Sequence, residues 1–137
     1  MPMLNVTLSQ SASLDPAVIP QVAAMLARLT HEILHKDPAV TAVAVALVPA
    51  AQWFVAGQSL EAVGLAGFWL DIVVTDGTNT KDEKAAYVAA VFAAMADLIG
   101  PLHTESYVLV REVKADAYGY GGRTQEARYV QSKMKAA

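Results

Sequence analysis

The clearest secondary-structure signals in this chain lie in residues 68–99, FWLDIVVTDGTNTKDEKAAYVAAVFAAMADLI. Its opening segment, Phe68 to Thr75, is rich in aromatic and β-branched residues and is typical of a strand. Asp76-Gly77 then predicts a turn, and Thr80-Lys81-Asp82-Glu83 has the pattern of a helix capping box. Apolar residues recur at helical spacing until Gly100-Pro101 ends the helix, and the predicted stripe is Ala85, Val88, Phe92, Met95 and Ile99.

Outward from this segment, further strands are predicted on both sides. Ser106 to Lys114 reads as a strand, and Ala115 to Gly122 as a turn or hairpin rich in glycine and tyrosine. Upstream, Met3 to Leu8 and Val43 to Val48 are short β-prone runs. A second helix is expected between these two runs.

This helix, which comes first in chain order, is expected around Asp15 to Lys36. Its apolar residues follow helical spacing, and the face comprises Val18, Ile19, Val22, Met25, Leu26, Leu29 and Ile33. Pro16 suits the first turn after Asp15 as the cap. Pro20 is predicted to lie beyond the first turn and to cost a backbone hydrogen bond, so we expect an irregular start.

The two halves therefore repeat one strand-helix-strand plan, and each ends in an aromatic tail. Pro2 and Phe68 are 66 positions apart, and Phe54 and Tyr118 are 64 apart, so an internal duplication is the simplest explanation. We expect one α+β domain over residues 1–137, with unit one at about 2–60, unit two at about 68–122 and a tail over 123–137. Each crossover pairs its strands in parallel, which predicts a four-stranded mixed sheet with both helices on one face. The uncovered face predicts a small ring of subunits.

Composition excludes several classes of protein. Of the 137 residues, 55% are hydrophobic and only 17% are charged, so the chain is not a disordered or solvated tail. A formal net charge of −3 without a basic block argues against a nucleic-acid partner. The absence of cysteine removes disulfides and thiolate nucleophiles, fits a reducing compartment and leads us to expect a cytoplasmic protein.

Neither a targeting signal nor a membrane span is expected. The start, MPMLNVTLSQ, lacks the basic and long apolar regions of a signal peptide. The most apolar segment, Ala85 to Leu102, is interrupted by Asp97 and Gly100, which favours a buried amphipathic helix.

Pro2 is the first candidate for chemistry. Once Met1 is removed, Pro2 carries a secondary amine; α-amines have pKa values of about 7.7 to 8 in water, and burial or nearby cations lower them. The neutral amine is then a general base. A retained Met1 turns the same nitrogen into a tertiary amide without a basic lone pair. Met-Pro also fits a chain whose second residue has no chemical role.

The ordered set of Pro2 heading the first strand, the unit over Leu70 to Ile99 and the glycine-rich run Ala117 to Gly122 resembles the tautomerase superfamily. Its members include 4-oxalocrotonate tautomerase, macrophage migration inhibitory factor and the 3-chloroacrylate dehalogenases. The resemblance covers nearly the whole chain. It implies a homotrimer of fused units without a cofactor, in which Pro2 moves a proton between enol and keto forms of a small 2-oxo acid or related carbonyl compound.

The resemblance also implies site residues. Phe68 stands where a second catalytic proline would lie, so we expect one active site per chain. Lys36 resembles the pocket lysine of the migration inhibitory factor branch, and Tyr107 falls on its pocket tyrosine, which the neighbouring subunit contributes. Trp53 and Phe54 occupy the place of the aromatic wall in short tautomerases.

The carboxylate-binding arginines of the family are missing. Their positions match Ala12, Val43, Thr78 and Tyr107 for the 4-oxalocrotonate branch, and Thr75 and Thr78 for the cis-dehalogenase branch. This argues against a dicarboxylate or haloacrylate substrate. Arg111, on the face of Tyr107 by period-two counting, is the expected substitute cation. Each of these side chains also fits an ordinary role in the core, an interface or a surface salt bridge.

A competing motif lies on the first helix. His31-Glu32-Ile33-Leu34-His35 spells H-E-x-x-H, the pattern of zinc peptidases, in which both imidazoles share one helix face. The predicted helix ends at Lys36-Asp37-Pro38, no further histidine motif follows, and Arg28 would oppose a cation. We therefore expect no metal site. The preferred prediction is a tautomerase, ahead of a non-catalytic trimeric binding or scaffold protein, with the zinc peptidase third.

Overall fold

The computed structural model describes residues 2–136 and contains two successive β-α-β units. The first consists of β1 (Met3–Gln10), α1 (Val18–Leu34) and β2 (Ala42–Pro49). The second consists of β5 (Phe68–Thr75), α3 (Lys81–Ile99) and β6 (Tyr107–Val113). Shorter elements connect and follow them: η1 (Pro38–Val40), η2 (Ala50–Gln52), β3 (Phe54–Val55), β4 (Gln58–Ser59), α2 (Leu60–Val63), β7 (Gly119–Tyr120), β8 (Arg123–Thr124) and α4 (Gln125–Ala136).

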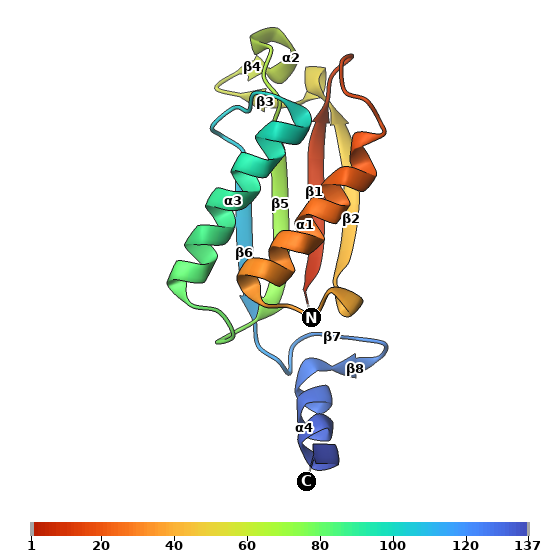
Figure 1. Ribbon diagram of the computed structural model, residues 1–137. Coiled ribbons are helices and arrows are strands. Elements are labelled where there is room, and N and C mark those ends of the chain that lie inside the picture. Colours follow the sequence, from red (N-terminus) through yellow and green to blue (C-terminus); the bar gives the residue numbers. More distant parts are fainter. Residues whose placement is uncertain (1, 137) are drawn as a thin grey trace.

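The four long strands form one mixed sheet in the order β2-β1-β5-β6, and both long helices cover the same face (Figure 1). β1 and β2 pair in parallel, as do β5 and β6, whereas the central strands β1 and β5 are antiparallel. The α+β fold class, the mixed sheet and the one-sided helices are thereby confirmed. Because the two units run in opposite directions, the beginning of β1 lies beside the end of β5.

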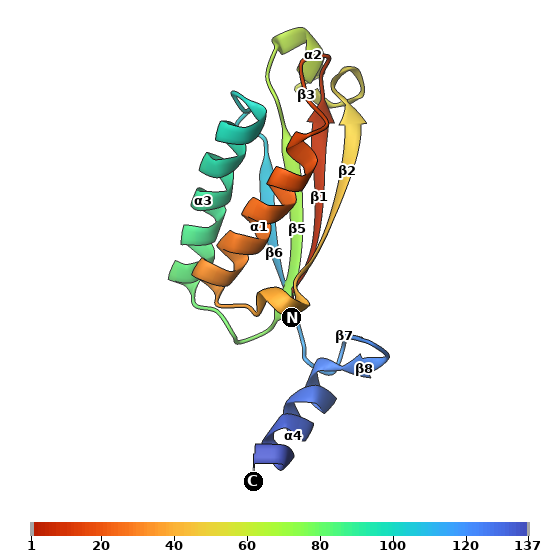
Figure 2. The same cartoon turned by 45° about the vertical axis from the view of Figure 1, so that its right-hand side comes forward.

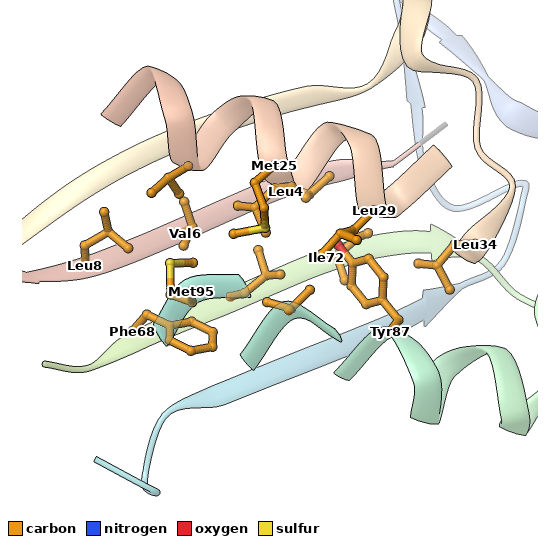
Figure 3. Packing of buried hydrophobic residues seen from close by; sticks show 14 of the residues in the cluster. Leu4, Val6, Leu8, Met25, Leu29, Leu34, Phe68, Ile72, Tyr87 and Met95 are labelled. Atoms are coloured by element: carbon orange, nitrogen blue, oxygen red, sulfur yellow. The ribbon is translucent and has the colours of Figure 1, made fainter. Parts of the chain in front are cut away.

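The core lies between the sheet and the helices. Leu4, Val6 and Leu8 of β1 alternate with exposed or half-buried residues, as expected for a strand with one covered face. Phe68, Leu70 and Ile72 of β5 do the same. Figure 3 shows Phe68 and Ile72 among the side chains of α1 and α3. The cluster is completed by Val74 of the sheet and by Val18, Val22, Met25, Leu26, Leu29, Leu34, Tyr87, Val91 and Met95 of the helices.

The two long helices differ from the sequence-based prediction in detail. α3 begins with the predicted capping box at Thr80 and Glu83 and ends before Gly100, but its buried residues are Tyr87, Val91 and Met95. Val88, which the prediction placed in the stripe, is 40% exposed. The helix is rich in alanine, so neighbouring faces fit the helical spacing almost equally well.

The start of α1 was also predicted incorrectly. The helix begins at Val18, so Pro20 lies within the first turn, where backbone N–H groups have no intrahelical partner. Pro20 therefore costs no helical hydrogen bond. The expected irregularity comes before it, where the Asp15 side chain accepts a 2.9 Å hydrogen bond from the backbone N–H of Ala17.

The uncovered sheet face exposes a row of apolar side chains. Met3, Trp69, Tyr107 and Leu109 lie at alternate positions of their strands and are between 38% and 48% exposed. Beyond the sheet, hairpin β7–β8 leads into α4, which projects away from the body (Figure 2). No helix within residues 2–136 has the length and apolar character needed to cross a membrane.

Candidate active site

Pro2 lies immediately before β1 and is buried. Its carbonyl oxygen accepts a 3.3 Å hydrogen bond from the backbone N–H of Ala42, the first residue of β2. The chain therefore fixes Pro2 at the end of the sheet where β1 and β2 begin and β5 and β6 end. The end of α1 and the turn after β5 reach the same region (Figure 1).

Lys36 lies at this end of the sheet and is only 9% exposed. Its Nζ atom donates a 2.8 Å hydrogen bond to Oγ1 of Thr78, whose hydroxyl donates a 2.6 Å bond to the carbonyl oxygen of Thr75. Burial lowers the pKa of the Lys36 ammonium, and the negative charge of Glu83 partly opposes that shift. The arrangement holds a partly desolvated cation near the Pro2 end of the sheet.

The end of α1 sets the position of Lys36. His35 adopts a left-handed backbone conformation with φ of 60° and ends the helix. The backbone N–H of His35 donates a hydrogen bond to the carbonyl oxygen of His31, and the N–H of Lys36 donates one to the carbonyl oxygen of Thr30. The ring Nδ1 of His31 lies 3.0 Å from the carbonyl oxygen of Lys36. Asn79 adds a 2.9 Å bond from Nδ2 to the carbonyl oxygen of Leu34 and so ties this helix end to the turn after β5.

This geometry corrects the expectation that His31 and His35 present their rings on one helix face. α1 ends at Leu34, so His35 lies beyond the helix, and its Nε2 is 3.1 Å from Oε2 of Glu83. His31 instead caps the helix end through the carbonyl oxygen of Lys36. Across residues 2–136, no three histidine or acidic side chains are grouped so as to hold a metal ion.

Arg111 lies in the same sheet row as the start of β1. Val73 pairs with Met3 on one side and with Arg111 on the other. The guanidinium is bound by Asp71 through bonds of 2.8 Å from Nη2 and 3.3 Å from Nε, and this carboxylate raises the Arg111 pKa. Arg111 thus lies toward the Pro2 end of the sheet, on the open face, and is engaged in an ion pair.

Three other expected pocket residues lie at the opposite end of the sheet. Tyr107 of β6 pairs with Trp69 of β5, and Trp69 pairs with Thr7 of β1. Thr7 lies four residues after Met3, which is about 13 Å along the strand. Trp53 and Phe54 lie beside Tyr107 in a hollow at that end. Within one chain, these aromatic residues do not meet Pro2.

Tyr118 was not among the predicted site residues, although it lies at the Pro2 end of the sheet. This residue precedes hairpin β7–β8, and its hydroxyl lies 2.5 Å from Oγ1 of Thr75 at the end of β5. It is the counterpart of Phe54 in the internal repeat. Because β1 and β5 are antiparallel, the tail of unit two returns to the start of β1. The repeat offset from Phe54 to Tyr118 shows that the two residues are equivalent in sequence. Placing Tyr118 near Pro2 also required the antiparallel pairing of β1 with β5.

Comparison with known proteins identifies the architecture. No protein-family model and no curated protein sequence matches this chain. Solved structures do match: a symmetric trimer of a fused 4-OT superposes with a TM-score of 0.78 at 24% identity and covers 92% of this chain and 98% of its own. This is the fold of the tautomerase superfamily, in its fused form.

Two further structures carry the same tautomerase fold. Pt0534 inactivated by 2-oxo-3-pentynoate superposes with a TM-score of 0.79 at 16% identity, covering 92% of this chain and 98% of that one. A macrophage migration inhibitory factor-like protein from Entamoeba histolytica gives a TM-score of 0.73 at 17% identity, covering 90% and 97%. The resemblance inferred from the sequence is confirmed at the level of the fold.

Proposed function

We propose that this chain is a keto–enol tautomerase that acts on a small 2-oxo acid or related carbonyl compound and uses Pro2 as its acid–base catalyst. The observation that carries the proposal is the burial of Pro2 at the end of the sheet that also holds the buried Lys36 cation. The positions of Pro2 and Lys36 both follow from the way this fold arranges its strands and helices. One similar structure, Pt0534, was inactivated by 2-oxo-3-pentynoate, and this compound belongs to the proposed substrate class.

The chemistry requires the neutral secondary amine of Pro2 in a chain without Met1. Its nitrogen takes the hydroxyl proton of the enol, and the resulting ammonium returns a proton to the adjacent carbon. The keto acid then leaves with Pro2 neutral again, so the cycle balances without an oxidant or reductant. General acid–base catalysis of this kind contributes about 10² to 10⁴ in rate.

Lys36 supplies the positive charge that this reaction needs. Negative charge develops on the oxygen of the enolate, and a preorganised, partly desolvated cation stabilises such charge better than water does. The hydrogen bond to Thr78 keeps Nζ in one place before substrate binds. Lys36 is therefore the proposed enolate or carboxylate partner, and Arg111 is a second cation near the same end of the sheet.

The active form is proposed to be a homotrimer. The exposed row of Met3, Trp69, Tyr107 and Leu109 leaves an apolar sheet face uncovered in the single chain, which association would bury. Two fused 4-OT structures with this fold, one symmetric and one asymmetric, are trimers. In such a trimer, Tyr107, Trp53 and Phe54 could line the active site only of a neighbouring subunit, because within one chain they lie far from Pro2.

The test is ultraviolet-monitored ketonisation of phenylenolpyruvate and 2-hydroxymuconate by protein shown by mass spectrometry to lack Met1. Wild type should accelerate at least one reaction with saturation, and Pro2→Ala should lower the rate about a hundredfold or more. Equal rates for the two proteins would contradict the proposal. Circular dichroism of both proteins separates a catalytic loss from unfolding.

A non-catalytic binding or scaffold protein of the same fold is the second candidate. One observation favours it: both cations near Pro2 already have partners in the chain, Lys36 with Thr78 and Arg111 with Asp71. A scaffold predicts negligible, unsaturated rates on both enols, with an intact trimer and no effect of Pro2→Ala. The same assay therefore separates the two candidates.

A further inference from the structure

The C-terminal helix α4 extends away from the two β-α-β units, beyond the Pro2 end of the sheet (Figures 1 and 2). It has 12 residues. Isolated helices of about this length are only marginally stable in water, and most helices in proteins are stabilised by packing of an amphipathic face. α4 therefore needs a surface to pack against, and in both views the β-α-β units of its own chain lie away from it.

Contacts with hairpin β7–β8 set the direction of α4. The backbone N–H of Gln125 donates a 2.9 Å hydrogen bond to the carbonyl oxygen of Tyr118. The guanidinium of Arg128 lies 3.7 Å from the centre of the Tyr120 ring, and its Nη2 donates a 2.9 Å bond to the carbonyl oxygen of that residue. The Tyr118 hydroxyl in turn joins the hairpin to the end of β5. These contacts hold α4 away from the body of its own chain.

One side of α4 is apolar and uncovered. Ala127, Val130 and Met134 follow the i, i+3, i+7 spacing that places residues on one side of a helix. Val130 is 46% exposed and Met134 is 74% exposed. Ser132 lies on the other side of the helix by the same spacing. The apolar side is therefore the side on which α4 would gain stability from a partner.

The charges of the chain are divided unequally between its body and its C-terminal segment. Residues 1–122 contain 6 Lys and Arg against 12 Asp and Glu, whereas residues 123–137 contain 4 against 1. The body therefore has a formal charge of −6 and the segment that includes α4 has one of +3. Opposite charges favour contact between a basic helix and an acidic body. Because hairpin β7–β8 holds α4 away from its own body, the body of a second copy is the complementary surface.

We propose that α4 packs on the body of a neighbouring subunit, with Ala127, Val130 and Met134 against it, and so links the subunits of the assembly. This inference rests on the proposed homotrimer. α4 follows β6, which lies at one edge of the sheet and carries Leu109 on the open face. A subunit that covers this face lies close to the point where α4 leaves the body. The contact of α4 therefore continues the interface proposed for the sheet.

Site-directed photo-cross-linking tests this contact, because the chain has no cysteine and a single introduced one can be labelled. Full-length Met134→Cys is labelled with benzophenone-4-maleimide and irradiated. Denaturing electrophoresis then separates joined chains from single ones, and mass spectrometry identifies the linked peptides. We expect joined chains in which residue 134 is linked to residues 1–122 of another copy. Ser132→Cys carries the same label on the other side of α4 and should leave most chains single.

Two further conditions test what holds the contact. Val130→Ser, added to Met134→Cys, should cause loss of most of the joined chains because it removes an apolar contact. Raising sodium chloride from about 0.05 M to about 0.5 M should also lower their yield, because salt screens the attraction between α4 and the acidic body. Circular dichroism checks that each variant folds. A yield that neither change lowers would overturn the proposed packing.

Light scattering before irradiation separates this inference from the proposed homotrimer. If the labelled protein is a trimer whose cross-links stay within one chain or do not form, the inference about α4 is overturned and the trimer stands. A monomeric protein without joined chains overturns both. Co-sedimentation of the unlabelled protein with phosphatidylserine vesicles, together with an absence of joined chains, would overturn the inference in favour of an anionic membrane surface as the partner of α4.

Discussion

Nζ of Lys36 donates a 2.8 Å hydrogen bond to Oγ1 of Thr78 and so joins the end of α1 to the turn after β5. The two residues are far apart in sequence and come from different units of the repeat. Their contact exists because β1 and β5 are antiparallel, which places the end of β5 at the end of the sheet where Pro2 lies. This bond fixes the cation on which the proposed chemistry depends.

Thr78→Val should impair catalysis without removing any group that touches substrate. The variant withdraws the hydroxyl acceptor, so the protonated form of the buried lysine becomes less favourable and its ammonium less well placed. We expect kcat/KM to fall about tenfold, the scale of a lost hydrogen bond to a charged group. The alkaline limb of the pH–rate profile should also move to lower pH. Thr78→Ser should restore both values, and a Thr78→Val profile identical to that of wild type would contradict this positioning role.

The lowered pKa of Lys36 makes stability depend on pH. Between its folded-state pKa and the ordinary value of 10.5, the unfolded chain binds more protons at this residue than the folded chain does. The free energy of unfolding should therefore contain a contribution that rises with pH through that window and levels off above it. Denaturant unfolding at pH 7 to 10.5 should show this contribution in wild type and in Lys114→Met, which removes an exposed lysine. If Lys36→Met kept the same rise, burial of Lys36 would not be its cause.

Tyr87 is the buried link between α3 and α1. Its hydroxyl lies 2.9 Å from Oγ1 of Thr30, and burial raises its pKa to about 12. Tyr87→Phe should cost about 1 kcal/mol at neutral pH, because Thr30 keeps its bond to the carbonyl oxygen of Leu26. The Tyr87 contribution to stability should be complete below pH 10 and disappear as the pH rises toward 12.

Denaturant unfolding at pH 7, 10 and 11.5 measures both effects of Tyr87. The stability difference between wild type and Tyr87→Phe should shrink between pH 10 and pH 11.5. Tyr129→Phe, at a 60% exposed position on α4, provides the control and should match wild type throughout. A difference that stays constant over this range would rule out ionisation of Tyr87 as the cause.

Leu109→Glu should dissociate the proposed trimer. Leu109 is 38% exposed on the uncovered sheet face, and a carboxylate there would have to be desolvated without a partner on association. Val88→Glu places the same charge at a 40% exposed position on α3, on the other side of the sheet, and should leave assembly intact. Light scattering during size-exclusion chromatography measures the mass of each. A monomeric wild type, or a trimeric Leu109→Glu protein, contradicts the assignment of this face.

Local sequence signals predicted most of the fold. Phe68 to Thr75 is a strand with the predicted bounds, because a run of β-branched and aromatic residues is followed at once by turn residues. The reciprocal bonds of Thr80 and Glu83 likewise follow from short-range chemistry. Side-chain burial on α3 was harder to predict, because alanine fits either face and only the packing of Tyr87 against α1 decides between them.

The candidate site was less accessible to sequence reasoning. Pro2 and Lys36 could be proposed one at a time, but the pairing of β1 with β5 decides which residues share their end of the sheet. Because of that pairing, Trp53 and Tyr107 lie at the end of the sheet opposite Pro2, and Tyr118 lies at the Pro2 end. Antiparallel association of the two units is tertiary information, and neither hydrophobic periodicity nor turn residues encode it.

If the nitrogen of Pro2 is the catalytic base, activity requires the removal of Met1, and a comparison of two forms of the same chain tests this directly. Protein lacking Met1 and protein retaining it are separated, verified by mass spectrometry and assayed on the same enol under identical conditions. Only the first form has a basic amine at Pro2, so we predict that it is faster by about a hundredfold or more. Equal ketonisation rates in the two forms would show that the nitrogen of Pro2 is not the catalytic base.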